Sequence, residues 1–234
     1  MVKQAVPASL TSRSRRDQVS SDPVASRAHG LAEATSSLPA EGQAISAGIS
    51  AARASGVATT FFEVPARGHK IVFVIDRSAS MGLDGAFAAV QNELRDSLTR
   101  LAPEVEFQVI AYNRSAEPLR LGGRFGWAAA TAQNTAEASA EIAKLRAEGG
   151  TDHLAALKKA LMLQPDVVYF LTDADGISDQ TIRLATAFNR GHAIIHAIFA
   201  RHGELAGTDA DLGLLSRANG GMHRLLILDP SKSR

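Results

Sequence analysis

Several features that define other protein classes are missing from this 234-residue chain. It has no cysteine, which excludes disulfide scaffolds, thiolate metal clusters and cysteine-based catalysis. Its formal net charge is only +1, so nucleic acid is not an expected partner. No stretch approaches the roughly 18 consecutive apolar residues of a membrane span, and residues 1–10 lack the apolar core of a signal peptide. We therefore expect the chain as it stands to be soluble, with the cytoplasm as the default compartment and a membrane-anchored parent protein left open.

Aromatic residues are scarce, at 5% of the chain, and none precedes Phe61. The first 57 residues consist largely of Ala, Ser, Gly, Arg and Pro. A segment so poor in large apolar side chains cannot offset the roughly 1–2 kcal/mol per residue that ordering the backbone costs. We expect residues 1–57 to form a flexible, largely disordered tail, with a short helix at 41–57 as an alternative. A single domain is then predicted at residues 58–230, followed by a tail at 231–234.

Four short segments of the predicted domain are rich in Val, Ile and Phe and apolar at consecutive positions. This pattern is typical of strands that are buried on both faces of a parallel sheet. The segments are residues 71–75, 106–111, 167–171 and 193–200. A further run at 59–64 precedes a Pro-Ala-Arg-Gly sequence, which predicts a turn into the 71–75 strand and a hairpin of these two segments that adds an antiparallel strand to the sheet.

The segments between these strands have helical periodicity. One apolar stripe ends before Pro103 and consists of Leu83, Phe87, Val90, Leu94, Leu98 and Leu101. Further helices are predicted from Leu154 to Leu161, from Ile182 to Phe188 and from Thr208 to Gly220, and residues 127–147 are helical by propensity. Alternation of strands and helices predicts an α/β fold: a Rossmann-like, three-layer open sheet, mostly parallel with one antiparallel strand, and with helices on both faces.

Side chains that carry oxygen follow two of the predicted strands. Asp76, Ser78 and Ser80 lie on the loop after the first strand, and Asp173 follows the third. Thr151 comes directly after a Gly-Gly pair at the start of a predicted helix. Because the carboxyl ends of parallel strands share one edge of the sheet, we expect these loops to converge. Ligands that are all oxygen favour a hard divalent cation, with Mg²⁺ first and Mn²⁺ or Ca²⁺ as alternatives.

This order of residues resembles the metal-ion-dependent adhesion site (MIDAS) of the von Willebrand factor type A (VWA) domain family. The resemblance covers roughly residues 59–228 and includes all five motif positions. It implies that the hydroxyls of Ser78, Ser80 and Thr151 bind the cation, while Asp76 and Asp173 are held close, often through water. Neutral ligands leave much of the charge of the cation unquenched, so the cation attracts a further anionic oxygen. The implied function is non-catalytic: the cation coordinates an Asp or Glu of an unknown partner protein.

The chain departs from the family pattern after Asp173, where Ala174 and Asp175 stand in place of the usual glycine. For Asp175 we favour a role in a local turn, with tighter metal binding and repulsion of an incoming carboxylate as alternatives. Arg77 either pairs with Asp175, presents a positive rim to an acidic ligand, or is solvated. These alternatives stay open at the level of the sequence.

Some of these residues also have simpler interpretations. Ser78, Ser80, Thr151 or Asp152 could act as helix caps, but capping does not explain both serines together with Asp76. Two histidines at positions 192 and 196 have a spacing that suggests zinc on a helix. They flank or lie in a predicted strand, so we expect structural or exposed roles for both.

An enzyme is the alternative function. Residues 167–176 also resemble the nucleophile loop of haloacid dehalogenase-type phosphatases, in which Asp173 would attack phosphorus and Asp175 would act as general acid beside Mg²⁺. That family places the loop at the start of its fold, and here the loop falls late in the chain. We therefore predict a binding module and keep the Mg²⁺-dependent phosphatase as the alternative.

Overall fold

The computed structural model of the chain describes residues 56–173, 177–202 and 210–228. Its strands are β1 (Val57–Phe61), β2 (Val64–Gly68), β3 (Lys70–Asp76), β4 (Glu106–Tyr112), β5 (Ala116–Pro118), β6 (Ala128–Ala129), β7 (Val167–Thr172), β8 (Ile194–His202) and β9 (His223–Leu228). Its helices are the 3₁₀ helix η1 (Ala79–Gly85) and the α-helices α2 (Ala86–Thr99), α3 (Ala132–Lys144), α4 (His153–Leu161), α5 (Asp179–Phe188) and α6 (Ala210–Ala218). The predicted tails lie almost entirely outside the described residues. Within the described ranges, every helix is too short or too polar to span a bilayer.

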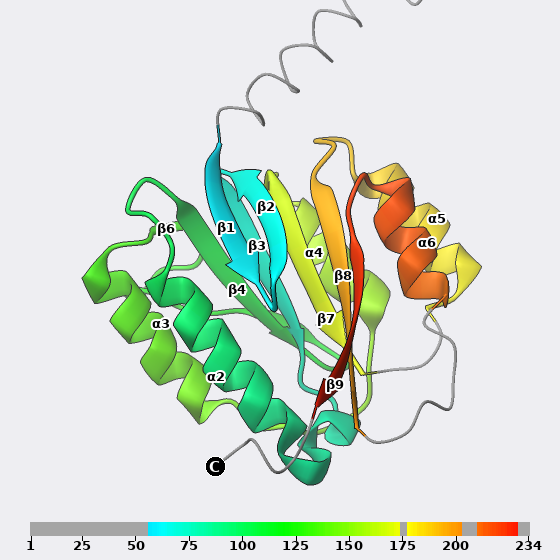
Figure 1. Ribbon diagram of the computed structural model, residues 1–234, viewed down its shortest axis with the longest axis horizontal. Helices are drawn as coiled ribbons and strands as arrows, with labels where there is room; N and C mark the ends of the chain where they lie inside the picture. Colours follow the sequence, from blue (N-terminus) through cyan, green and yellow to red (C-terminus); the bar gives the residue numbers. More distant parts are fainter. Residues whose placement is uncertain (1–55, 174–176, 203–209, 229–234) are drawn as a thin grey trace, which may run out of the picture. The chain divides into compact units, whose positions relative to one another are not determined.

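The main sheet has the strand order β5-β4-β3-β7-β8-β9, with β6 also paired to β4 (Figure 1). β4, β3, β7, β8 and β9 are parallel to their neighbours, whereas β5 and β6 run antiparallel to β4. The predicted α/β fold with an open, mostly parallel sheet is therefore confirmed, as are the four central strands. Strand β9, which the sequence analysis did not predict, extends the parallel sheet at one edge.

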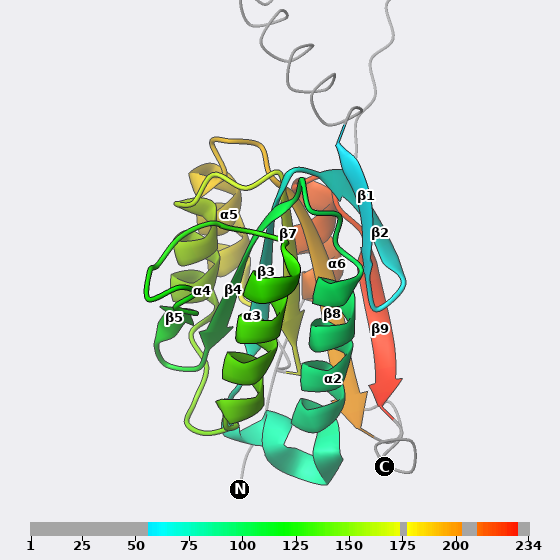
Figure 2. The ribbon, with the colours of Figure 1, turned by 90° about the vertical axis from the view of Figure 1, so that its left-hand side faces the viewer.

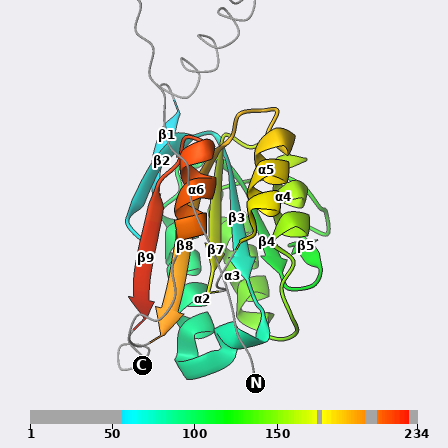
Figure 3. The same ribbon diagram turned by 90° about the vertical axis from the view of Figure 1, so that its right-hand side faces the viewer.

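Helices cover both faces of this sheet. α2 and α3 pack on one face with the side chains of Ile71, Phe73 and Ile75, which alternate along β3 (Figure 2). α4, α5 and α6 cover the other face, where Val72 and Val74 of the same strand are buried (Figure 3). Both sets of β3 side chains are fully buried or nearly so. The continuous apolar pattern of this strand thus reflects burial on both sides.

The predicted hairpin has a different register and a different place. β1 and β2 pair with each other around Phe62 and Glu63, both at positive φ, and form a separate two-stranded sheet. The sequence analysis was therefore wrong to put the turn at residues 65–68 and to place the 59–64 strand in the main sheet. The hairpin instead packs on the α2 and α3 face, where Phe61 contacts Phe73 and Tyr169 edge to face. Burial of these rings decides its position.

Two helix predictions also need correction. Leu83 is not part of the apolar stripe, because it lies in η1 with 62% of its surface exposed, and α2 begins only after Gly85, which adopts a left-handed conformation. The alanine-rich segment 127–147 is helical only as α3, since residues 128–129 pair with β4 instead. Ile142 is fully buried, as expected of an anchor.

Candidate metal centre

Asp76 is the last residue of β3, and β3 lies between β4 and β7. The chain continues from β3 to β4 on one side and reaches β7 on the other side, so the order of the sheet reverses at this point. Ligands of open α/β sheets bind at the carboxyl ends of the strands at such a reversal. The register places Asp76 opposite Tyr112 of β4, and Thr172 ends β7 on the other side. The centre is thus built on three neighbouring strand ends.

The Asp76 carboxylate is fully buried and is surrounded by neutral donors. Its Oδ2 accepts from the Thr172 hydroxyl at 2.6 Å and from the Tyr112 hydroxyl at 3.4 Å. Its Oδ1 accepts from the backbone amide of Ser78 at 2.8 Å. Among the described residues, no Lys or Arg pairs with this carboxylate. A buried carboxylate without a counter-charge is costly, so the site is one that a bound cation would stabilise.

Tyr112 and His153 support Asp76 from behind. Burial, followed by the charge of Asp76, raises the pKa of Tyr112 well above its usual value, so the phenol keeps its proton. The Tyr112 oxygen lies 3.0 Å from Nδ1 of His153, whose pKa is lowered by burial. Sequence reasoning missed Tyr112 and gave no role to Thr172. The only signal for either was its position as the last residue of a buried strand.

The loop after β3 carries both serines. The Ser78 hydroxyl lies 3.1 Å from the Ser80 hydroxyl, and the Ser80 hydroxyl donates to Oδ1 of Asp173 at 2.9 Å. Ser78 is buried, Ser80 is exposed and Asp173 is half-buried. Ser78 stands at the N-cap position of η1, yet its side chain makes no capping hydrogen bond. The three side chains therefore form a hydrogen-bonded line of oxygens that leads from the buried Ser78 to the surface, and the amide of Ser78 ties this line to Asp76.

Thr151 lies on the third loop, which backbone hydrogen bonds tie to the first. The amide of Ala79 donates to the carbonyl of Gly149 at 2.9 Å, and the backbone amide of Glu148 donates to the carbonyl of Arg77 at 2.7 Å. The capping role at α4 falls to Asp152, whose Oδ1 accepts from Ala155. Within the described ranges, no hydrogen bond joins the Thr151 hydroxyl to the line of oxygens. The structure thus links Asp76, Ser78, Ser80 and Asp173 directly and brings in Thr151 through its loop.

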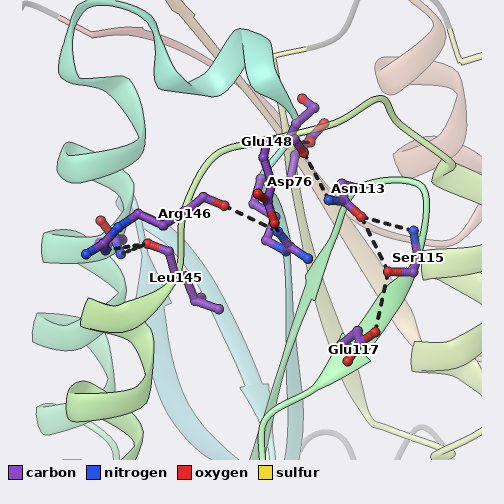
Figure 4. A network of polar contacts seen from close by, with 10 residues as sticks. Asp76, Asn113, Ser115, Glu117, Leu145, Arg146 and Glu148 are labelled. Carbon is purple, nitrogen blue, oxygen red and sulfur yellow. Dashed lines mark hydrogen bonds and ion pairs between the residues drawn. The ribbon is translucent and has the colours of Figure 1, made fainter.

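Arg77 pairs with Glu148 rather than standing free. Its guanidinium lies 3.0 Å from the Glu148 carboxylate and donates to the carbonyl of Arg146 at 3.3 Å. Only 16% of the Arg77 side chain is exposed, so the solvated alternative is wrong. Figure 4 shows Arg146 and Glu148 on the loop that leads to Thr151, facing Asp76 at the end of β3. Asp175 and its predicted turn lie outside the described residues.

The residues present fit a hard divalent cation. The candidate donors are hydroxyls and carboxylates, with no sulfur and no ring nitrogen among them. No cluster of three or more His, Cys, Asp or Glu occurs in the described part of the chain, so a site made only of such side chains is not available there. Oxygen donors of mixed charge suit Mg²⁺, Mn²⁺ or Ca²⁺ better than softer metals.

Comparison with known proteins supports the same family. Residues 71–176 match the family model described as the von Willebrand factor type A domain. The matched range begins with β3 and includes the loops of Asp76, Thr151 and Asp173. VWA domains are typically protein-interaction modules. No curated protein matches the sequence.

Solved structures with this fold are distant in sequence. A von Willebrand factor type A protein from Catenulispora acidiphila is 21% identical with a TM-score of 0.62, over 73% of this chain and 41% of that one. BatB from Bacteroides thetaiotaomicron is 10% identical with a TM-score of 0.56, over 71% and 94% of the two chains. Proximal thread matrix protein 1 of the mussel byssus, with a zinc-occupied MIDAS motif, is 18% identical with a TM-score of 0.52, over 68% and 41%. This chain thus spans about two fifths of the first and third structures, and these likenesses show the fold alone. None of them supports the phosphatase alternative.

Proposed function

We propose that this chain is a non-catalytic protein-interaction module that binds a divalent cation and uses it to coordinate an Asp or Glu of a partner protein. Ser78, Ser80 and Thr151 supply hydroxyl ligands, and Asp76 and Asp173 are held close to the cation, often through water. Mg²⁺ is the first choice, with Mn²⁺ or Ca²⁺ as alternatives. The observation that carries the proposal is the buried Asp76 carboxylate, which has no cationic partner among the described residues and which the amide of Ser78 ties to the hydrogen-bonded serine hydroxyls.

The chemistry of the site follows from the charges of its ligands. Hydroxyls donate electron pairs but no net charge, so a cation held by them keeps most of its positive charge. When bound, the cation supplies an electrophilic position that accepts a carboxylate oxygen. Asp76 contributes its negative charge at a depth where water does not screen it, and it orients Ser78 through the backbone amide. The exposed Ser80 and half-buried Asp173 leave the outer side of the site open to a partner.

Calorimetry with magnesium chloride and manganese chloride tests the metal site. The unaltered chain should bind at least one of these cations. The double variant Ser78→Ala with Ser80→Ala should bind it at least about tenfold more weakly, because two of the three hydroxyl ligands are removed. Its thermal unfolding should stay cooperative.

A serine elsewhere provides the matched control. Ser178 caps α5 through its hydroxyl, so Ser178→Ala removes a hydroxyl that the structure uses without altering the proposed ligands. This variant should lose about 1 kcal/mol of stability and keep its affinity for the metal. Equal affinity of the double variant and the unaltered chain would overturn the site. Hydrolysis of an aryl phosphate that Asp173→Asn abolishes would support the phosphatase instead.

A further inference from the structure

Arg114 presents a positive charge beside the proposed metal centre. It lies on the short loop between β4 and β5 and is exposed. Among the described residues, its guanidinium takes part in no ion pair or hydrogen bond. Arg77, the arginine on the loop after β3, is already neutralised by Glu148 at 3.0 Å. Arg114 is therefore the arginine of this pair whose charge stays available to an incoming anion.

The Arg114 side chain lies against the loop that carries Thr151. A Cβ atom added at Gly150 would stand 3.0 Å from Nε of Arg114 and 3.7 Å from its Cζ. Gly150 directly precedes Thr151, and consecutive Cα atoms are about 3.8 Å apart. The stem of Arg114 thus rests on the backbone next to a proposed ligand of the cation. The missing side chain at Gly150 leaves the space that this contact needs.

The base of Arg114 is held in place by its neighbours. Asn113 and Ser115 exchange hydrogen bonds across Arg114: the amide of Asn113 donates to the carbonyl of Ser115 at 2.9 Å, and the amide of Ser115 donates to Oδ1 of Asn113 at 3.1 Å. Nδ2 of Asn113 also donates to the carbonyl of Glu148 at 2.9 Å, and the amide of Asp152 donates to the carbonyl of Asn113 at 2.8 Å. Figure 4 shows Asn113 between Ser115 and Glu148. These bonds join the two loops and so hold the backbone of Arg114 at a fixed distance from that of Thr151.

We propose that Arg114 forms an anion subsite next to the metal centre, and that the partner segment carries two acidic residues close together. One carboxylate binds the cation, and the other pairs with the guanidinium of Arg114. A guanidinium matches a carboxylate through two parallel N–H donors, which gives it a geometric preference that a solvated charge lacks. The inference rests on the proposed function and specifies its partner as an acidic segment with paired Asp or Glu residues.

Two kinds of short peptide test this subsite. The first kind contains one Asp among glycines, and the second contains two Asp separated by zero, one or two glycines, all with blocked ends. Chemical-shift titration of the isotope-labelled chain in saturating Mg²⁺ measures the affinity for each. We expect at least one two-Asp peptide to bind roughly fivefold or more tightly than the one-Asp peptide, as for a favourable exposed ion pair.

Variants of Arg114 then test whether this residue causes the preference for two-Asp peptides. Arg114→Ala should bring the affinity for the two-Asp peptide down to that for the one-Asp peptide, and Arg114→Lys should keep part of the preference. Calorimetry should show the same Mg²⁺ affinity in both variants. The exposed Arg190, which lies between α5 and β8 at the amino end of the strands, is the control: Arg190→Ala removes an equal charge and should leave the preference intact.

The outcomes separate this inference from the function on which it rests. If the unaltered chain binds no Asp peptide in an Mg²⁺-dependent way, the proposed function is wrong and the subsite falls with it. If Mg²⁺-dependent binding occurs and Arg114→Ala retains the full preference for two carboxylates, only the subsite is overturned. Loss of the preference in Arg190→Ala to the same extent would also overturn it, because net charge alone would then explain the result.

Discussion

The two ends of the parallel strands use similar polar residues in different ways. At the amino end, the Asp166 carboxylate accepts from the backbone amides of His69 and Lys70 at 2.7 and 2.9 Å. Nearby, the buried Asn189 exchanges two hydrogen bonds with the backbone of Ala193, both at 2.8 Å. At the carboxyl end, the Ser80 hydroxyl instead bonds to other side chains that bear oxygen.

This difference separates polar contacts that support the fold from those to which we assign a proposed function. Polar side chains at the amino end satisfy backbone groups, including those of the buried Ala193, so their hydrogen bonds contribute to the stability of the fold. The hydroxyls of Ser78 and Ser80 satisfy one another, and a cation can replace those contacts at little structural cost. Polar side chains therefore stabilise the fold at the amino end of the sheet, and at the carboxyl end we propose that they bind a ligand.

The largest effect that we expect from the amino end is a dependence on pH through His196. Burial lowers its pKa to about 4, and its Nδ1 accepts from the amide of Met222. Between the ordinary value of 6.5 and about 4, the unfolded chain binds more protons than the folded one. The contribution of His196 to stability is therefore complete above about pH 6.5 and is lost as the pH falls to about 4, by about 3 kcal/mol in total.

Urea unfolding at a series of pH values measures this dependence. His196→Gln keeps an acceptor for the amide of Met222 but cannot take up the proton. The free energy of unfolding of the unaltered chain should therefore fall toward that of the variant as the pH falls from 6.5 to 4. If the free energy of unfolding changes with pH in the same way in both chains over this window, His196 does not titrate as the structure implies.

Asn189→Ala should have the next largest effect. It leaves the N–H and C=O groups of Ala193 without their partner and removes a bond of 2.9 Å to Asn219, so we expect a loss of about 2–3 kcal/mol in the free energy of unfolding. Calorimetry should find an unchanged affinity for Mg²⁺. A fall in affinity like that of the Ser78 and Ser80 double variant would remove the distinction between the two ends of the sheet.

Glu148→Gln should have the smallest effect. The Glu148 side chain is 68% exposed, so its ion pair with Arg77 contributes less than about 1 kcal/mol to stability. Thermal unfolding should therefore change little, since the bond from Arg77 to the carbonyl of Arg146 remains. A loss of several kcal/mol would mean that the carboxyl end, like the amino end, depends on its polar contacts for folding.

Much of the fold could be predicted from local patterns. Strands β3 and β7 have unbroken apolar runs because both of their faces are buried, and β4 and β8 have the same pattern interrupted by Gln108 and His196. The hairpin was misplaced because its turn at Phe62 and Glu63 contains no glycine or proline, while Pro65 lies within β2. β9 was missed because its six residues contain a single β-branched side chain.

The sequence by itself determined which oxygen-bearing residues follow which strands, and hence the kind of cation that they suit. Only the tertiary structure decided which of them meet. Asp76 and Thr172 are 96 residues apart, and Ser80 and Asp173 are 93 apart, yet each pair is hydrogen-bonded. The register of neighbouring parallel strands brings these pairs together, and the bonds of Asn113 to the neighbouring loop place Arg114 beside Thr151. Such contacts depend on packing between distant segments, which no local pattern of residues encodes.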